Sequence, residues 1–294
     1  MPSKSRDRHL AKNAERRRQE RTRAKRSKQA ALGVGGVIAA VLLILLGIGI
    51  LTRNSERQQA AATPSISAPG GSSGPTQTGT VTPEPNPAAK VACGAEVPAA
   101  ASEPKPQFDR APTPDEVLKK DTTYTAVMQT SCGTIRIELD EKASPQSVAN
   151  FVFLAEQRFY DGQSVPRVVD SIDVVQAGAP TGTTSGGPGY TIPDELTGKE
   201  HYAPGTIAMA NAGPNTAGSQ FFLITGPEGA NLDGAPNYTI FGQVTEGLDV
   251  AKQINALMPV QDGSYDGPPT EAVYIEQVTI ERSKTPTPSP SPGG

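Results

Sequence analysis

The sequence lacks tryptophan and contains only two histidines and two cysteines among its 294 residues. His9 lies in a highly charged segment, so His201 has no second histidine near it with which to form a metal site or a proton relay. Cys93 and Cys132 are too few for a four-cysteine zinc site and too far apart for a CxxC redox motif. Aromatic residues make up only 5% of the chain, so the core must be modest and mostly aliphatic. We expect no metal and no other cofactor.

Charge is unevenly distributed along the chain. Residues 1–28 contain twelve Lys or Arg and three Asp or Glu, a net charge of +9. The remainder has 15 basic and 27 acidic residues, a net charge of −12. The two parts are therefore expected to meet different surroundings. The basic part has no aromatic residue, and we expect it to contact lipid headgroups rather than nucleic acid.

A long apolar run follows the basic segment. Residues 30–51 contain no charged residue, and as a helix they would span roughly 33 Å, enough to cross a hydrocarbon core of about 30 Å. We predict a single transmembrane helix at 30–52 with residues 1–29 in the cytoplasm, because the basic flank is N-terminal. A cleaved signal peptide is the alternative, although its apolar region is usually shorter, about 7–15 residues. The rest of the chain is then extracytoplasmic.

Two segments have the composition of disordered chain. Residues 54–114 contain eleven prolines together with many Ser, Thr, Ala and Gly, which predicts a disordered linker over 53–114. The tail 285–294 has the same character. One folded domain is therefore expected at 115–284. Outside the cytoplasm Cys93 and Cys132 could form a disulfide that joins the end of the linker to the domain; two unpaired thiols are the alternative.

Hydrophobic periodicity predicts a mainly β domain. Ile135, Ile137 and Leu139 alternate with charged residues, as in a half-buried strand, and a turn at 131–133 would join this strand to the one before it. Ser144 is the expected N-cap of a helix that ends before Gly162. A second helix fits 246–257. Strands are predicted at 123–130, 134–140, 172–176, 206–210, 219–225, 238–244 and 271–282. Spacing alone leaves both a barrel and a sandwich open, and two helices with many strands favour a closed antiparallel barrel.

One long motif is much more specific than these patterns. Residues 208–222 read AMANAGPNTAGSQFF, flanked by SPQSVANFVFLAEQRFYDG at 144–162 and YTIFGQV at 238–244. This set resembles the cyclophilins, the peptidyl-prolyl cis-trans isomerases, over roughly 123–282. The resemblance implies a closed eight-stranded barrel capped by two α-helices. The sequence is thus identified as a suspected bacterial, membrane-anchored member of this family.

The resemblance also implies roles for individual residues. Arg167 matches the catalytic arginine of the family, and Gln176 matches the glutamine that supports it. The residues that match the substrate-binding pocket are Val174, Ala210, Asn211, Gln220, Phe222, Leu232 and Tyr238.

Near the arginine the sequence departs from the family pattern. Pro166 replaces a histidine, and one extra residue separates Arg167 from Gln176, so the aromatic wall of the proline slot falls on Ile172 or Asp173. An aspartate there would make the slot more polar and could pair with Arg167. Asn231 stands where a tryptophan associated with cyclosporin binding is usual.

These observations predict a monomeric prolyl isomerase held on the outer face of a membrane. Isomerisation transfers no proton, so a catalytic triad is not required; an apolar slot, backbone hydrogen bonds and a fixed cation suffice. Its substrates would be unfolded or extracytoplasmic polypeptides that contain proline. The alternative is a chaperone or scaffold module that binds such segments with little or no catalysis.

Overall fold

The computed structural model describes residues 74–83, 90–259 and 265–284. All of these residues belong to one compact unit. Within the described ranges, no helix is both long and apolar enough to cross a bilayer. The predicted transmembrane helix at 30–52, the basic tail 1–29 and the tail 285–294 lie outside them.

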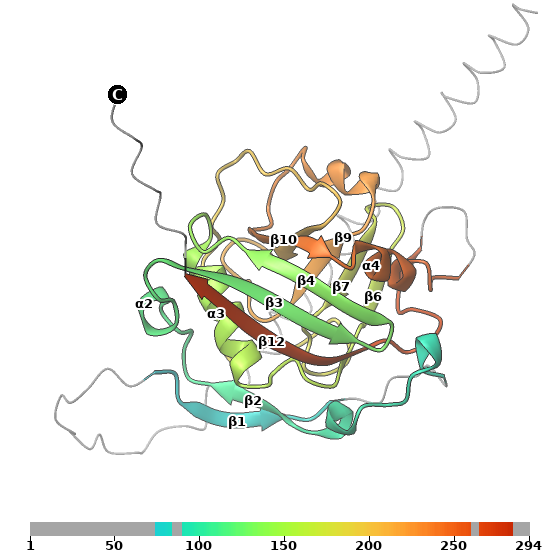
Figure 1. Cartoon of the computed structure of the whole chain (residues 1–294), viewed down its shortest axis with the longest axis horizontal. Helices are drawn as coiled ribbons and strands as arrows, with labels where there is room; N and C mark the ends of the chain where they lie inside the picture. Colours follow the sequence, from blue (N-terminus) through green and yellow to red (C-terminus); the bar gives the residue numbers. More distant parts are fainter. Residues whose placement is uncertain (1–73, 84–89, 260–264, 285–294) are drawn as a thin grey trace, which may run out of the picture. The chain divides into compact units, whose positions relative to one another are not determined.

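A twisted antiparallel sheet of ten strands forms the body of the domain (Figure 1). Its order is β11-β6-β7-β9-β8-β10-β4-β3-β12-β5. The strands are β3 (Thr122–Thr130), β4 (Gly133–Leu139), β5 (Gln163–Ser164), β6 (Arg167–Val169), β7 (Val174–Ala177), β8 (Thr206–Met209), β9 (Phe221–Ile224), β10 (Ile240–Glu246), β11 (Asp266–Gly267) and β12 (Tyr274–Lys284).

The sheet has ten strands rather than the eight predicted for a closed barrel. All seven strands predicted from periodicity are present, but β5, β6 and β11 have only two or three residues each, too few to show an alternating pattern. No ladder among the described residues joins the β11 end of the sheet to the β5 end, so closure is not confirmed.

The chain itself links the two ends of the sheet. Only Val165 and Pro166 separate β5, which pairs with β12, from β6, which pairs with β7 and β11. Proline has no N–H to donate to a ladder, and here it stands where the chain leaves one set of partners for another. The replacement of a histidine by Pro166 is therefore compatible with the sheet.

Both predicted helices are present. They are α3 (Pro145–Glu156) and α4 (Leu248–Asn255), and a four-residue helix, α2 (Pro114–Val117), precedes β3. Helix α3 packs on β12, and α4 packs on β4 and β7. Phe151 of α3 is fully buried and its ring lies 5.0–5.5 Å from those of Tyr160, Phe221 and Phe241. This aromatic cluster fixes α3 in the core.

Ser144 is the N-cap residue of α3, as predicted, but its side chain does not bond the first turn of the helix. The Ser144 hydroxyl donates to the carbonyl of Ile240 instead. The carboxylate of Glu195 accepts hydrogen bonds from the amides of Gln146 and Ser147, each at 2.8 Å. An acidic group satisfies these amides and also interacts favourably with the helix dipole, so the cap ties the loop around Glu195 to α3.

Much of the predicted linker belongs to the folded unit. Strand β1 (Gln77–Val81) pairs with β2 (Lys105–Phe108), and two 3₁₀ turns lie between them, η2 (Ala92–Gly94) and η3 (Ala99–Ser102). Figure 1 shows this β1–β2 pair at the edge of the domain on the side of β12. The composition of 53–114 predicted disorder because it is poor in apolar residues. Backbone ladders and a few buried side chains order the described part, because backbone hydrogen bonds do not depend on composition.

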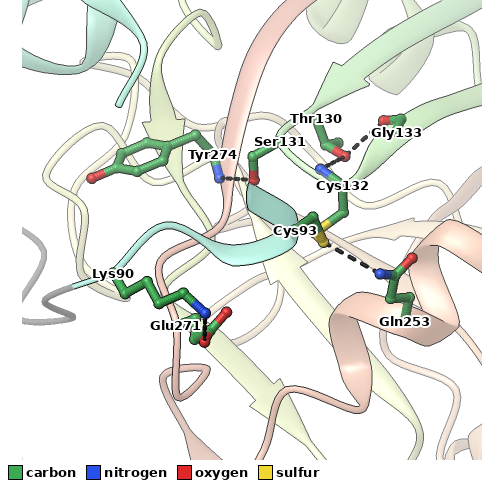
Figure 2. The surroundings of a disulfide bond; sticks show 9 residues. All are labelled: Lys90, Cys93, Thr130, Ser131, Cys132, Gly133, Gln253, Glu271 and Tyr274. Atoms are coloured by element: carbon green, nitrogen blue, oxygen red, sulfur yellow. Dashed lines mark hydrogen bonds and ion pairs between the residues drawn. A yellow bond between two sulfur atoms is a disulfide. The ribbon is translucent and has the colours of Figure 1, made fainter. Parts of the chain in front are cut away.

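Several contacts attach this N-terminal segment to the domain, and three of them involve covalent bonding or buried side chains. Cys93 and Cys132 form a disulfide, with their Cα atoms 5.1 Å apart (Figure 2). Lys105 is 2% exposed and donates to the carbonyls of Ala100 and Asp161, while burial lowers its pKa. Phe108 is buried and its ring meets that of Phe153 edge to face at 4.8 Å.

We expect the double substitution Cys93→Ala and Cys132→Ala to lower the free energy of unfolding by about 3–4 kcal/mol. The disulfide spans 39 residues, and its loss frees the unfolded chain. Urea denaturation of a chain that starts at residue 71 measures the effect. Reduced wild type should match the double variant. A loss under about 1 kcal/mol would mean that the other contacts hold the segment without the disulfide.

Candidate functional site

A small slot of about 110 Å³ opens on the face of the sheet formed by β6, β7 and β9. Its volume is below the range of about 300–1,000 Å³ typical of sites for drug-sized ligands, so it suits one small side chain. Eight of the nine predicted site residues line it, and Ile172 is the additional member. The lining consists of Arg167, Ile172, Val174, Gln176, Ala210, Asn211, Phe222, Leu232 and Tyr238.

Strand register explains why the central residues meet. Arg167 of β6 lies directly opposite Gln176 of β7, and Gln176 lies directly opposite Phe222 of β9. Side chains directly opposite each other in an antiparallel ladder point to the same face of the sheet. Three residues that are up to 55 positions apart in the sequence (167 to 222) therefore form one row.

The apolar part of the slot rests on a second, smaller core cluster. Phe222 is 5% exposed, and its ring meets that of Tyr238 edge to face at 5.2 Å. The cluster also includes Val174 and Tyr202, with Leu232 packed against it. Burial raises the pKa of Tyr202 to about 12. Its neutral hydroxyl donates to the carbonyl of Tyr238 and accepts from the Tyr238 amide, which fixes one wall of the slot.

The Arg167 guanidinium is held at three of its nitrogen atoms. Nε and Nη2 donate to the two carboxylate oxygens of Asp266 at 2.5 and 2.6 Å, and Nη1 donates to Oε1 of Gln176 at 2.8 Å. Hydrogen bonding between Arg167 and Asp266 raises the pKa of the arginine and lowers the pKa of the aspartate. These bonds use three of the five N–H groups of arginine, so two remain for a substrate.

Gln176 continues the hydrogen-bonded row. Its Nε2 donates to Oε1 of Gln220 at 2.9 Å, and Nε2 of Gln220 donates to the carbonyls of Thr184 and Gly186. Gln220, which is predicted to be a pocket residue, does not line the slot. It lines a second, larger cavity and joins Gln176 to the glycine-rich loop at 182–189. The lining of this cavity includes the loop.

The second cavity has a volume of about 730 Å³ and shares one edge with the slot. The residues common to both are Gln176, Ala210 and Asn211. A peptide with one residue in the slot can therefore extend over this shared edge into the larger cavity.

The structure decides between the two candidates for the wall of the slot. Ile172 lines the slot, whereas Asp173 turns away and accepts a hydrogen bond from the amide of Glu228 at 2.8 Å. The extra residue thus leaves the wall apolar, and Asp173 does not pair with Arg167. Asn231 is not in the lining of the slot; its side-chain amide donates to the carbonyl of Ser171.

Sequence reasoning missed Asp266, the partner of Arg167. It lies in a two-residue strand within a segment rich in Gly and Pro, and no motif surrounds it. Only the pairing of β11 with β6, which places Asp266 opposite Val169, brings it within reach of the arginine. His201, by contrast, is exposed and bonds Asp233, away from the slot lining.

Comparison with known proteins shows which family the domain resembles. The model of the cyclophilin type peptidyl-prolyl cis-trans isomerase family matches residues 125–280. A peptidyl-prolyl cis-trans isomerase of Synechococcus elongatus is 45% identical over 132 residues, 45% of this chain and 87% of the relative. Peptidyl-prolyl cis-trans isomerase B of Bacillus subtilis is 46% identical over 122 residues, 41% of this chain and 82% of the relative.

A solved structure of a cyclophilin type isomerase from Cryptosporidium parvum is also similar. It is 25% identical and aligns with a TM-score of 0.47 over 54% of this chain and 98% of its own.

Among the described residues, no group of three or more His, Cys, Asp or Glu could hold a metal ion.

The ion pair between Arg167 and Asp266 should contribute little to stability. The two side chains are 32% and 51% exposed, and pairs open to solvent typically contribute less than about 1 kcal/mol. A double-mutant cycle with Arg167→Ala and Asp266→Ala, followed by urea denaturation, measures the coupling. Because the pKa of Asp266 is lowered, any contribution is present at neutral pH and is lost as the pH falls through that pKa. A coupling above about 2 kcal/mol would contradict a mainly positional role.

Proposed function

The chain belongs to the cyclophilin-type peptidyl-prolyl cis-trans isomerase family, and we propose that Arg167 is its catalytic residue. The isomerisation itself follows from the family and from relatives that carry this name at 38–46% identity.

The barrier arises from amide resonance. Rotation about a prolyl bond passes through a twisted state about 18–20 kcal/mol above the planar forms, and uncatalysed exchange takes tens of seconds or longer. In the twisted state the amide nitrogen is no longer conjugated and can accept a hydrogen bond. A donor that is fixed beside this nitrogen stabilises the twisted state more than the planar ones, which is the condition for catalysis.

The slot supplies the required parts. Phe222, Val174 and Ile172 offer an apolar surface for the proline ring. Arg167 lies at the same slot and has two N–H groups beyond those bonded to Asp266 and Gln176. A guanidinium stays charged at all physiological pH values, so its donors are always present.

Asp266 and Gln176 act as positioning residues in this proposal. Together they bond three nitrogens of one planar group, which restricts its rotation. A preorganised donor is more effective than a mobile one, because no reorganisation is needed as the amide twists. The substrate backbone would lie along Ala210 and Asn211. The Asn211 side chain donates to the carbonyl of Asn237, so we assign substrate binding to the main chain here.

We further propose that the domain acts outside the cytoplasm, anchored by a helix over residues 30–52. The charge asymmetry and the uncharged run at 30–51 support an anchored topology. The disulfide between Cys93 and Cys132 supports an oxidising compartment. Its substrates would then be exported polypeptides that are still unfolded, which expose prolyl bonds to a tethered enzyme.

Replacement of Arg167 by alanine should reduce kcat/KM for a proline-containing peptide by about a hundredfold. Loss of one preorganised donor typically costs 10²–10³-fold in rate. Arg167→Lys should also be slow, because one ammonium cannot reproduce the planar contacts to Asp266 and Gln176. A protease-coupled isomerisation assay measures the rate.

Arg136→Ala is the matched control for this experiment. Arg136 is also paired with a carboxylate, that of Glu281, but it projects from β4 and does not line the slot. It should keep the wild-type rate. Equal rates for wild type and Arg167→Ala would contradict the catalytic role of Arg167. Peptide binding by wild type without any rate enhancement would instead favour the chaperone or scaffold alternative.

The anchor is tested by deletion of residues 30–51. The full chain should sediment with membranes and remain there after a high-salt wash, whereas the deleted chain should be soluble. Salt removes proteins held only by the basic tail, because it screens attraction to headgroups. Release of the full chain by salt, or a mature chain that begins after residue 52, would contradict the uncleaved anchor.

A further inference from the structure

The N-terminal segment contributes to the larger cavity although it lies outside the matched family domain. That domain begins at residue 125, whereas β2 spans Lys105–Phe108. Gln107 of β2 lines the cavity of about 730 Å³. Part of the lining of this cavity is therefore supplied by a segment outside the matched domain.

The contact between β2 and the glycine-rich loop is close and specific. Nε2 of Gln107 donates to the carbonyl of Gly187 at 2.7 Å, and the amide of Phe108 donates to the carbonyl of Pro188 at 2.8 Å. Gly189 has a φ of +98°, and a Cβ atom there would lie 2.6 Å from the carbonyl oxygen of Phe108. Only glycine allows β2 to approach the loop so closely. The strand is thus fitted against the loop.

Hydrogen bonds continue from this contact to the slot. The loop accepts from Gln107 at Gly187 and from Gln220 at Gly186. Gln220 bonds Gln176, which in turn accepts from Arg167. Gln107 is therefore at the outer end of a connected row whose inner end is the proposed catalytic arginine.

The lining of the cavity indicates the chemistry it can accept. It consists of amide side chains, hydroxyls, glycines and alanines with one tyrosine, and none of its residues carries a formal charge. A buried charge without a partner is costly, whereas an uncharged polar or small side chain finds donors and acceptors there. Gln107 is half-buried and contributes an amide to this lining.

We propose that Gln107 is a specificity-determining residue. It selects the side chain of the substrate residue that enters the larger cavity when the proline occupies the slot. This inference rests on the proposed function, because the peptide must place its proline in the slot. The neighbouring part of the peptide crosses the shared edge at Ala210 and Asn211 and enters the larger cavity. There Gln107 favours an uncharged side chain and disfavours a charged one.

Charge substitutions at Gln107 test the proposal. Two full-length variants in detergent, Gln107→Glu and Gln107→Lys, are assayed with peptides that carry Gln, Lys or Glu in turn at each of the three positions on either side of the proline. The quantity compared is kcat/KM for the Lys peptide divided by kcat/KM for the Glu peptide. Gln107→Glu should raise this ratio about fivefold and Gln107→Lys should lower it about fivefold, both at the same peptide position. Both shifts should arise mainly from KM. A purely structural role would not produce opposite shifts.

Gln77→Glu and Gln77→Lys are the matched controls. Gln77 lies on β1, which pairs with β2. It is exposed, and its side chain donates to the carbonyl of Gly79 rather than to the loop. These variants carry the same net charge and should leave the ratio as in wild type. Equal shifts at positions 77 and 107, or no shift at 107, would overturn the proposal while leaving isomerase activity intact.

Two further measurements keep the test decisive. A charged variant that shows no cooperative thermal unfolding is not properly folded, and Gln107→Ala is then tested in its place. This variant enlarges the cavity and should raise kcat/KM for a Tyr peptide relative to an Ala peptide about fivefold; an unchanged ratio overturns the proposal. If wild type isomerises no peptide, the catalytic proposal fails separately. The affinities of the same variants for the Lys and Glu peptides are then measured by fluorescence anisotropy. The ratio of the two affinities should shift in the same opposite directions if Gln107 has the proposed role.

Discussion

The functional site depends on the register between β6, β7 and β9. This register aligns Arg167, Gln176 and Phe222 in one row across three strands, with a cation at one end and an apolar ring at the other. A shift by one residue in any of these strands would turn its member of the row to the opposite face of the sheet. In β7 such a shift would turn the polar Gln176 to the face where Val175 and Ala177 join the main core, which is unfavourable for an amide side chain without a partner.

The hydrogen-bonded row gives a simple electrostatic arrangement at the slot. One carboxylate and one amide hold a guanidinium, so the cation is fixed without being fully desolvated. The apolar side of the slot is maintained by a separate core cluster around Phe222 and Tyr202. Positioning of charge and shaping of the apolar surface are thus carried by different groups of residues.

The segment before the domain is a structural part of the molecule rather than only a tether. Between residues 90 and 117 it is joined to the domain by a disulfide, a buried lysine and the contact of β2 with the glycine-rich loop. Lys105 illustrates why composition alone misleads here. A charged residue in a segment rich in Pro and Ala is expected to be exposed to solvent. The ammonium group of Lys105 is instead buried and donates to two carbonyl groups.

The sequence by itself determined the family, the seven longer strands, both main helices and the residues around the slot. A long motif retains family identity, and alternation in a long strand such as β4 indicates which face is buried. Tertiary structure alone decided that Ile172 rather than Asp173 lines the slot, that Glu195 caps α3 and that Asp266 and Gln107 reach the site. Each of these contacts joins residues whose proximity is set by strand pairing or loop packing, and a short strand or a single polar residue in a loop leaves no periodic pattern in the sequence.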